Sequence, residues 1–318
     1  MVVLVTGAAG FIGSSLIEKL LELEHEVVGL DNFEPFYDPA IKRRNLECLR
    51  GIGDFTFVEG DIRDRSALRR TFESQEIDAV IHLAAMAGVR PSIRDPLHYS
   101  DVNITGTMIL LEEMRNRSVG KLLFGSSSSV YGGSSNVPFR EDQAADRPVS
   151  PYAATKRAGE ILCHSHHHLF GLEVACLRFF TVYGPRQRPE MAIHAFTRRI
   201  MRGEPIAFFG DGSSRRDYTF VSDIVDGVIA ALDRAEGYQI YNLGGSSTVS
   251  LAELVELIEE RVGRPAVLDR MPEQPGDVPI TYADVGKARA EIGYDPKVDI
   301  RSGLDRFVAW YRATQSMG

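Results

Sequence analysis

Apolar runs and amphipathic stretches alternate along the first half of the chain. Short runs rich in β-branched residues occupy residues 2–7, 26–31, 55–61, 79–85 and 121–128. Stretches with apolar residues at helical spacing come between them, at residues 14–25, at residues 65–74 and from about Val102 onward. Buried strands that alternate with helices are typical of a parallel sheet covered on both faces. We therefore predict an α/β fold of the Rossmann type, with a doubly wound parallel sheet.

The pattern loosens in the second half of the chain. After residues 173–185, Pro- and Gly-rich pieces separate short helices. A strand-like run at residues 238–245 can return to the main sheet. We expect a sheet-forming domain over residues 1–178, with a returning segment near residues 217–248, and a smaller, interwoven C-terminal substrate lobe over residues 179–318.

Composition and charge narrow the class of protein. The 318 residues are 44% hydrophobic and 25% charged, as in globular proteins. The net charge of -8 argues against nucleic-acid binding, because binding to phosphates needs a basic surface. No apolar run reaches the roughly 20 residues that cross a bilayer. We therefore expect no partner among nucleic acids or membranes.

The cysteines and the beginning of the chain indicate a cellular compartment. Cys48, Cys163 and Cys176 lack the paired spacing of a zinc site and fit a reducing environment, so we expect them to be buried. The first residues read as a strand rather than as a signal peptide. The sequence thus predicts a cytoplasmic protein without a structural metal.

Three glycines separate the first predicted strand from the first helix. Gly7, Gly10 and Gly13 lie in the segment TGAAGFIG. This spacing allows a tight turn whose backbone approaches a pyrophosphate at a helix N-terminus. Asp31 ends the second predicted strand, where a carboxylate can accept hydrogen bonds from ribose hydroxyls. We predict a dinucleotide site, and Asp31 favours NAD because the 2'-phosphate of NADP would meet a like charge.

Further cofactor contacts are expected after the next strands. Asp61 and Ile62 follow the third strand, where they can contact adenine. Small residues end the fourth strand, where a cofactor can lie close to the backbone. The predicted cofactor-binding residues are Gly7, Gly10, Phe11, Ile12, Gly13, Asp31, Asn32, Asp61, Ile62, Leu83, Ala84, Ala85, Asn103, Ser126, Tyr152 and Lys156.

Tyr152 stands four residues before Lys156, so the phenol and the ammonium share one face of a helix. Among 11 tyrosines, only Tyr152 has a lysine at this spacing. A free tyrosine has a pKa of about 10, which is too high for a base near neutrality. A nearby positive charge favours the phenolate. The pair can therefore serve proton transfer to and from a substrate.

With the glycine turn and the segments SSSSVYG and YAATK, the chain resembles the extended short-chain dehydrogenase/reductase family over nearly its whole length. Within that family it looks similar to nucleotide-sugar 4-epimerases, particularly those acting on UDP-glucuronate. The resemblance implies a catalytic set of Ser127, Tyr152 and Lys156, in which Tyr152 takes the proton of the sugar 4-hydroxyl while hydride passes to NAD. Four adjacent serines leave Ser126 and Ser128 as alternatives to Ser127.

The residue before the VYG segment bears on the reaction. Related dehydratases and decarboxylases carry an acidic residue there, whereas this chain has Ser129. The resemblance therefore implies epimerisation of UDP-glucuronate to UDP-galacturonate through a transient 4-keto sugar. The alternatives are a UDP-glucose or UDP-N-acetylhexosamine 4-epimerase and a non-catalytic dinucleotide-binding protein, which we would expect to lack Tyr152 or Lys156. The resemblance also implies a homodimer.

The same resemblance assigns residues to the UDP-sugar. Thr181 stands where galactose-type epimerases have Asn, and its hydroxyl can bond a sugar carboxylate. Arg90 and Arg188 are candidates for anion contacts, because guanidinium matches carboxylate and phosphate geometry. The predicted substrate-binding residues are Arg90, Ser127, Ser128, Tyr152, Thr181, Arg188, Met191, Ala192, Phe208 beside the base, Arg216 at the diphosphate and Asp277 at the uridine ribose.

Two features stand apart from the family pattern. Arg186 and Gln187 occupy positions where UDP-glucuronate 4-epimerases usually have Trp and Gly, so the shape of this loop is open. Four histidines between His164 and His168 cluster on one predicted helix. Metal sites usually draw ligands from separated segments, so we interpret this cluster as a helix surface.

Overall fold

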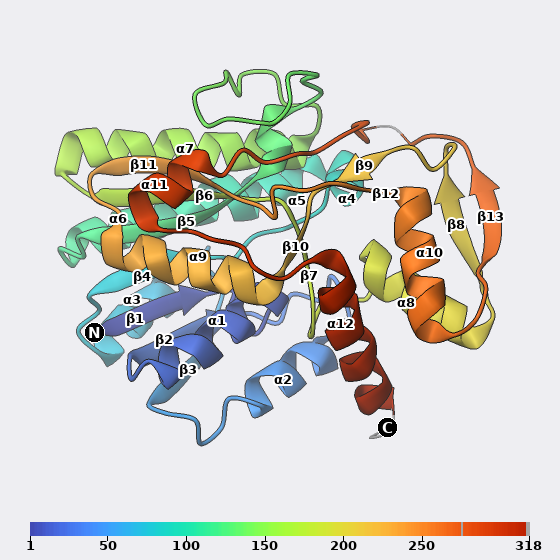
Figure 1. Ribbon diagram of the computed structural model, residues 1–318. Coiled ribbons are helices and arrows are strands. Elements are labelled where there is room, and N and C mark those ends of the chain that lie inside the picture. The colour runs from blue at the N-terminus through green and yellow to red at the C-terminus, as the bar shows by residue number, and fades with distance from the viewer. Residues whose placement is uncertain (275, 316–318) are drawn as a thin grey trace.

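A seven-stranded parallel sheet forms the centre of the protein (Figure 1). The computed structural model describes residues 1–274 and 276–315. The strands lie in the order β11 (Tyr238–Leu243), β6 (Glu173–Phe179), β5 (Lys121–Ser127), β4 (Ala79–His82), β1 (Val2–Thr6), β2 (Glu26–Asp31) and β3 (Phe55–Glu59). The strand order reverses between β1 and β4, and the carboxyl ends of these strands are where such folds bind ligands. The predicted α/β fold is confirmed.

Helices cover both faces of the sheet (Figure 1). One face is covered by α1 (Phe11–Glu22), α9 (Val221–Arg234) and α11 (Gly286–Ile292). The other face is covered by α3 (Arg65–Ser74), α6 (Thr107–Asn116) and α7 (Pro151–Phe170). Val5 packs with Leu16 and Val228 in one core, whereas the adjacent Leu4 packs with Leu68 and Leu110 in the second. Successive strand residues point to opposite faces, so both faces of this sheet are buried and its strands are almost entirely apolar.

The segment expected to return to the sheet does so. β11 pairs in parallel with β6, from Tyr238 opposite Val174 to Leu243 opposite Phe179. Two short pairs lie near it: β10 (Tyr218–Phe220) with β7 (Thr181–Tyr183), and β12 (Val249–Ser250) with β9 (Arg215–Arg216). The later part of the chain is therefore interwoven with the main sheet.

A smaller group of elements lies to the right of the main sheet in Figure 1. It contains α8 (Ala192–Arg202), β8 (Pro205–Phe209), α10 (Leu251–Val262) and β13 (Val267–Met271). β13 pairs in parallel with β8, and α10 packs against α8 and against α12 (Ile300–Gln315). α10 begins with a capping box between Ser250 and Glu253, which satisfies two backbone N–H groups of its first turn.

The helical region before α6 begins earlier than the sequence pattern suggests. Short helices α4 (Val89–Arg94) and α5 (Pro96–Ser100) precede a π-helical turn at Asp101–Gly106. The Asp95 carboxylate caps α5 by accepting the His98 N–H at 3.2 Å. The start expected near Val102 is thus the middle of a continuous helical path. None of the described helices is long and apolar enough to span a bilayer.

Two surface expectations need correction. Cys163 and Cys176 are buried as expected, but Cys48 is exposed. Within the histidine cluster, His164 and His168 are exposed on the helix surface as expected. His166 is buried instead, and its ring lies 3.5 Å from the Glu112 carboxylate. The face of α7 that packs on α6 includes His166, which the local pattern of histidines does not reveal.

Candidate active site

A cavity opens at the carboxyl ends of the strands, beside the switch point between β1 and β4. Its wall includes most of the predicted cofactor-binding residues: Gly7, Gly10, Phe11, Ile12, Gly13, Asp31, Asn32, Asp61, Ile62, Leu83, Ala84, Ala85, Ser126, Tyr152 and Lys156. Predicted substrate-binding residues also line it: Ser127, Ser128, Tyr152, Thr181, Arg188 and Met191. Segments far apart in the chain thus form one continuous wall.

The glycine turn has the backbone shape that a dinucleotide requires. Gly7 has a φ of +73°, and a Cβ there would lie 2.8 Å from the Ala84 backbone nitrogen. A Cβ at Gly13 would lie 2.1 Å from the Gly7 carbonyl oxygen, so helix and turn can pack this closely only without a side chain. α1 starts directly after Gly10 and directs its free N–H groups to the turn. These residues fit the pyrophosphate of NAD.

Asp31 is held in place at the end of β2. Its carboxylate accepts the backbone N–H of Ala9 at 3.1 Å and that of Phe33 at 2.8 Å. Each oxygen keeps a lone pair for a ribose hydroxyl. Asp61 accepts the Asn32 amide at 2.8 Å, and its hydrogen bond with Arg63 lowers its pKa to about 2. The adenosine end of the cavity therefore carries two fixed carboxylates.

Asn103 does not join the cavity wall. It lies in the π-helical turn, where its amide exchanges hydrogen bonds with the backbone of Met86 at 2.8 and 2.9 Å and donates to the Thr155 hydroxyl at 3.0 Å. Its side chain is used within the protein. Asn103 thereby orders the Met86 segment of the wall, and its predicted contact with the cofactor stays a prediction.

Tyr152 and Ser127 meet at the opposite end of the cavity. Tyr152 lies on the first turn of α7, whose N-cap Ser150 accepts the Ala153 N–H at 3.1 Å. Burial raises the pKa of Tyr152, whereas a hydrogen bond with the Ser127 hydroxyl and the charge of Arg188 lower it. Ser127 and Arg188 are therefore placed to stabilise a Tyr152 phenolate. Ser127 is also the serine that the family resemblance favours.

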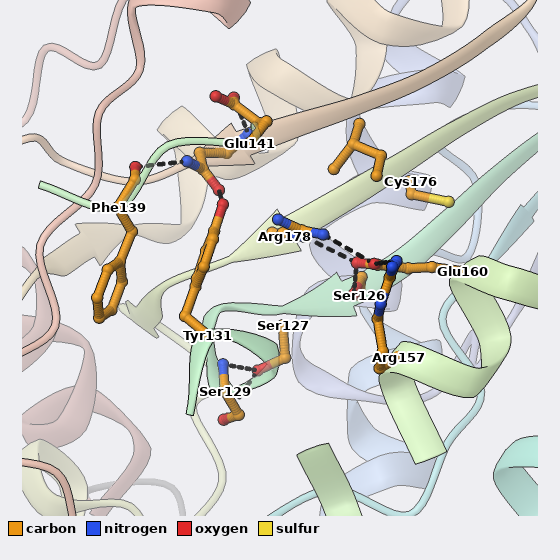
Figure 2. Close-up of polar contacts among 12 residues, drawn as sticks. Ser126, Ser127, Ser129, Tyr131, Phe139, Glu141, Arg157, Glu160, Cys176 and Arg178 are labelled. Atoms are coloured by element: carbon orange, nitrogen blue, oxygen red, sulfur yellow. Dashed lines mark hydrogen bonds and ion pairs between the residues drawn. The ribbon is translucent and has the colours of Figure 1, made fainter. Parts of the chain in front are cut away.

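Ser126 has a different partner from Ser127 and Ser129 (Figure 2). The Ser126 hydroxyl donates to the buried Glu160 carboxylate at 2.6 Å, away from Tyr152. The Ser127 hydroxyl lies 3.1 Å from that of Ser129 and accepts its backbone N–H at 3.2 Å. Alternation along β5 thus separates Ser126 from Ser127, and the geometry favours Ser127 as the serine beside Tyr152.

Lys156 lies one helical turn after Tyr152 and is buried. Its ammonium donates to the Gly125 carbonyl at 2.7 Å and lies 5.2 Å from the centre of the Phe124 ring. Burial lowers the pKa of Lys156 to about 8, while the charge of Glu160 is among the influences that oppose this change. The ammonium is thus anchored to the strand that carries Ser127.

This lowered pKa predicts how stability changes with pH. Between pH 8 and the ordinary lysine value of 10.5, folded Lys156 has lost its proton while the unfolded chain keeps it. Because the unfolded state then binds more protons, the free energy of unfolding rises with pH, by up to roughly 3 kcal/mol. Urea denaturation of cofactor-free protein at pH 7.5 and 10 should show this rise, and Lys156→Met should remove it. Equal pH dependence in both proteins would contradict the prediction.

An arginine lines the predicted substrate side of the cavity. Arg188 lines it, with its guanidinium 5.7 Å from the Phe36 ring centre and 3.3 Å from the Glu190 carboxylate. Thr181 and Met191 line the same region. Gln187, at the position where the family usually has Gly, is buried and donates to the Val182 carbonyl at 3.2 Å.

The neighbouring departure from the family pattern also has a structural partner. Arg186 adopts a φ of +67°, which is uncommon for a residue with a side chain. Its guanidinium lies 2.7 Å from the Glu18 carboxylate on α1. The loop that carries Arg188 is therefore tied to the helix that follows the glycine turn.

Five predicted substrate-binding residues are not brought to this cavity: Arg90, Ala192, Phe208, Arg216 and Asp277. Arg90 and Asp277 form an ion pair at 2.8 Å, and Arg90 stacks over Phe209. Phe208 is buried in the smaller lobe, with Arg270 over its ring, and Arg216 donates to the Arg215 carbonyl at 2.9 Å. Their contacts with the UDP-sugar therefore stay predictions.

Sequence reasoning missed several residues of the wall. They include Phe36, Tyr37 and Lys42, which lie between Asp31 and the end of α2 (Pro39–Glu47). No spacing rule identifies which side chains of this segment turn inward. The sequence singles out Ser129 only because related enzymes have an acidic residue at this position. The structure shows that Ser129 also lines the cavity.

Comparison with known proteins agrees with this geometry. Residues 3–244 match the NAD dependent epimerase/dehydratase family. A UDP-glucuronate 4-epimerase of Thermodesulfobacterium geofontis is 44% identical over 308 residues, which cover 96% of this chain and 95% of the relative. The crystal structure of UDP-glucuronic acid 4-epimerase from Bacillus cereus in complex with UDP-glucuronic acid and NAD is 37% identical, with a TM-score of 0.93, and covers 99% of this chain and 100% of that chain. UDP-glucose 4-epimerase from Thermotoga maritima with UDP-glucose is 33% identical, with a TM-score of 0.92 and the same coverage.

The chain belongs to the NAD dependent epimerase/dehydratase family. The match confirms the extended short-chain dehydrogenase/reductase resemblance, the cofactor NAD and the enzyme class, an NAD-dependent nucleotide-sugar 4-epimerase. The roles of individual site residues remain predictions, which the geometry described above now makes specific.

Proposed function

We propose that the enzyme inverts C4 of UDP-glucuronate to give UDP-galacturonate. The observation that carries this proposal is the placement of Tyr152 and Ser127 at the end of the NAD-fitting cavity that Arg188 also lines. The arrangement puts a proton acceptor in the same cavity as a guanidinium that can bind an acidic sugar. Relatives that bear the name UDP-glucuronate 4-epimerase support the choice of sugar.

Tyr152 acts as the acid and base in the proposed mechanism. The phenolate takes the proton of the 4-hydroxyl, and Ser127 hydrogen-bonds the same oxygen, so a 4-keto sugar forms. NAD held by the glycine turn and Asp31 would supply the acceptor, and afterwards the donor, of the C4 hydride. The sugar turns between the two steps and presents its opposite face, after which Tyr152 returns the proton. Lys156 holds positive charge beside this end of the cavity and favours the phenolate.

A 4-keto uronic acid is a β-keto acid and loses carbon dioxide readily, so the enzyme must hold its carboxylate. Arg188 and Thr181 are placed to bind that group. Ser128 and Ser129 line the wall where related dehydratases and decarboxylases have an acidic residue. We infer that these residues together favour return of the hydride over elimination or decarboxylation.

Proton NMR tests this function directly. Purified protein is incubated with UDP-glucuronate, with UDP-glucose in a parallel tube, and no reductant is added. The expected result is UDP-galacturonate in the first tube and no turnover in the second. A UDP-pentose product would contradict the roles proposed for Ser129 and Arg188. Turnover of UDP-glucose alone would support the alternative sugar; the Thermotoga maritima relative is a UDP-glucose 4-epimerase, which is the reason for this second tube.

We further propose a homodimer in the cytoplasm. Ile161 and Leu169 on α7 and Leu97 on α5 are apolar side chains that are 54%, 64% and 81% exposed. α5 packs on α7, so these side chains offer apolar surface that a second copy can cover. Sedimentation of the protein should give twice the mass of 35.2 kDa, and a monomer at all concentrations would reject the dimer. The free cysteines fit a reducing compartment such as the cytoplasm, and cell fractionation tests this location.

A further inference from the structure

We propose that Lys42 binds the cofactor, pairing with Asp31 at the adenosine ribose. The ammonium of Lys42 and the carboxylate of Asp31 both line the cavity and lie 3.7 Å apart. This inference rests on NAD binding and on the proposed ribose contact of Asp31. It does not require that the substrate be UDP-glucuronate.

Lys42 is buried without a hydrogen bond. Its side chain is 10% exposed, and in the part of the chain that the structure describes no acceptor lies within hydrogen-bonding distance of Nζ. The ammonium lies 5.3 Å from the centre of the Tyr37 ring. The ammonium lines the cavity. It has three donors, and donors that the protein leaves unused in a cavity wall are available to a ligand.

The position of Lys42 in its helix makes the same point. α2 begins at Pro39, with the Asp38 carboxylate accepting the Ala40 N–H at 2.9 Å. Lys42 therefore lies in the first turn, where the helix dipole disfavours a positive charge. The helix dipole therefore does not account for lysine at this position, where its ion-pair partner is Asp31. Local rules of this kind are broken mainly at functional sites.

The fold fixes Lys42 against the dinucleotide turn. Asn45, one turn further along α2, is buried and donates to the Ala9 carbonyl at 3.0 Å. Asp31 accepts the N–H of the same residue, Ala9, at 3.1 Å. The turn, the end of β2 and α2 are thus joined at Ala9. The ammonium is therefore held beside the carboxylate that we expect to bind the adenosine ribose.

The pairing has a consequence for cofactor choice. Asp31 alone would repel the 2'-phosphate of NADP, and the adjacent ammonium offsets part of that repulsion. Removing Lys42 should therefore weaken NADP binding by a larger factor than NAD binding. A purely structural effect on the cavity would weaken both nucleotides alike.

Calorimetric titration of NAD and NADP into nucleotide-free protein tests the proposal. Lys42→Met removes the ammonium and keeps an unbranched apolar side chain. The matched control is Arg43→Met, which makes the same charge change one residue later, at a side chain that is 56% exposed and outside the cavity wall. We expect Lys42→Met to raise the Kd for NAD roughly 10- to 100-fold, the range for a lost hydrogen bond from a charged group. Arg43→Met should change it by less than about threefold.

Equal Kd values for NAD in Lys42→Met and Arg43→Met would overturn the proposal. Equal losses for NAD and NADP would also overturn it, because they would assign Lys42 a structural role. Thermal unfolding shows whether each variant is folded. If Lys42→Met is not, Lys42→Gln, which keeps a polar side chain without charge, is titrated instead with the same expected loss. Epimerisation is not the readout, so failure of the proposed substrate would leave this test intact.

Discussion

Replacing Tyr152 by Phe is expected to lower kcat for C4 epimerisation by roughly 10²- to 10⁴-fold, the contribution of a general acid and base. The substitution removes only the phenolic oxygen. The ring keeps its edge contact with Tyr99 at 6.3 Å and its place on the first turn of α7. NAD affinity should therefore change little, and the loss should fall on kcat rather than on folding.

The measurement is the initial rate by NMR or a coupled assay for UDP-galacturonate, together with the NAD affinity of each protein. Tyr183→Phe is the matched control, since Tyr183 is also a buried tyrosine but its hydroxyl donates to the Asp299 carbonyl at 3.4 Å, outside the cavity wall. The control should keep nearly full activity. Unchanged kcat in Tyr152→Phe would reject Tyr152 as the acid and base.

Replacing Glu160 by Gln is expected to lower the free energy of unfolding by roughly 3–5 kcal/mol, the cost of leaving a buried charge without its partner. Both Glu160 and Arg178 are fully or almost fully buried. Arg178 makes two hydrogen bonds to the carboxylate, each of 2.9 Å, and Arg157 adds a third at 2.9 Å (Figure 2). Burial alone would raise the pKa of Glu160, but these arginines and Ser126 hold it below its ordinary value.

The double variant Glu160→Met with Arg178→Met removes both charges of the buried pair and so leaves no buried charge without its partner. Replacing a buried ion pair by apolar side chains of similar size is often neutral or stabilising, so we expect it to lose less stability than Glu160→Gln. Asp142→Asn is the surface control, because its partner Arg140 is exposed, and it should cost no more than about 1 kcal/mol. Urea denaturation of all variants at pH 7 gives the comparison. A similar cost for Glu160→Gln and Asp142→Asn would show that the buried pair contributes nothing particular.

The local motifs were predicted well because each depends on neighbouring residues. The turn at Gly7 and Gly13 is set by backbone crowding within a dozen residues, and a helix places Tyr152 and Lys156 on one face. The bounds of β1 and β2 follow apolar runs that are almost entirely buried. Family resemblance then supplied the reaction, which composition and spacing do not contain.

Long-range pairing limited the other predictions. Arg90 and Asp277 lie 187 residues apart in the chain, and no local pattern predicts their ion pair. Which of four adjacent serines meets Tyr152 depends on the register of β5 against α7, through the bond of Ser126 to Glu160. In both cases the two interacting residues lie far apart in the sequence.

The amino-acid sequence by itself determined the parallel α/β architecture, the NAD-binding turn with Asp31, and the Tyr152–Lys156 pair, because periodicity and short spacing act through the local backbone. The tertiary structure decided which side chains face the cavity. It brought Lys42 beside Asp31 and directed Ser127 rather than Ser126 to Tyr152. The physical reason is that inward orientation results from the packing of α2 and α7 on distant strands, and no local propensity encodes that packing.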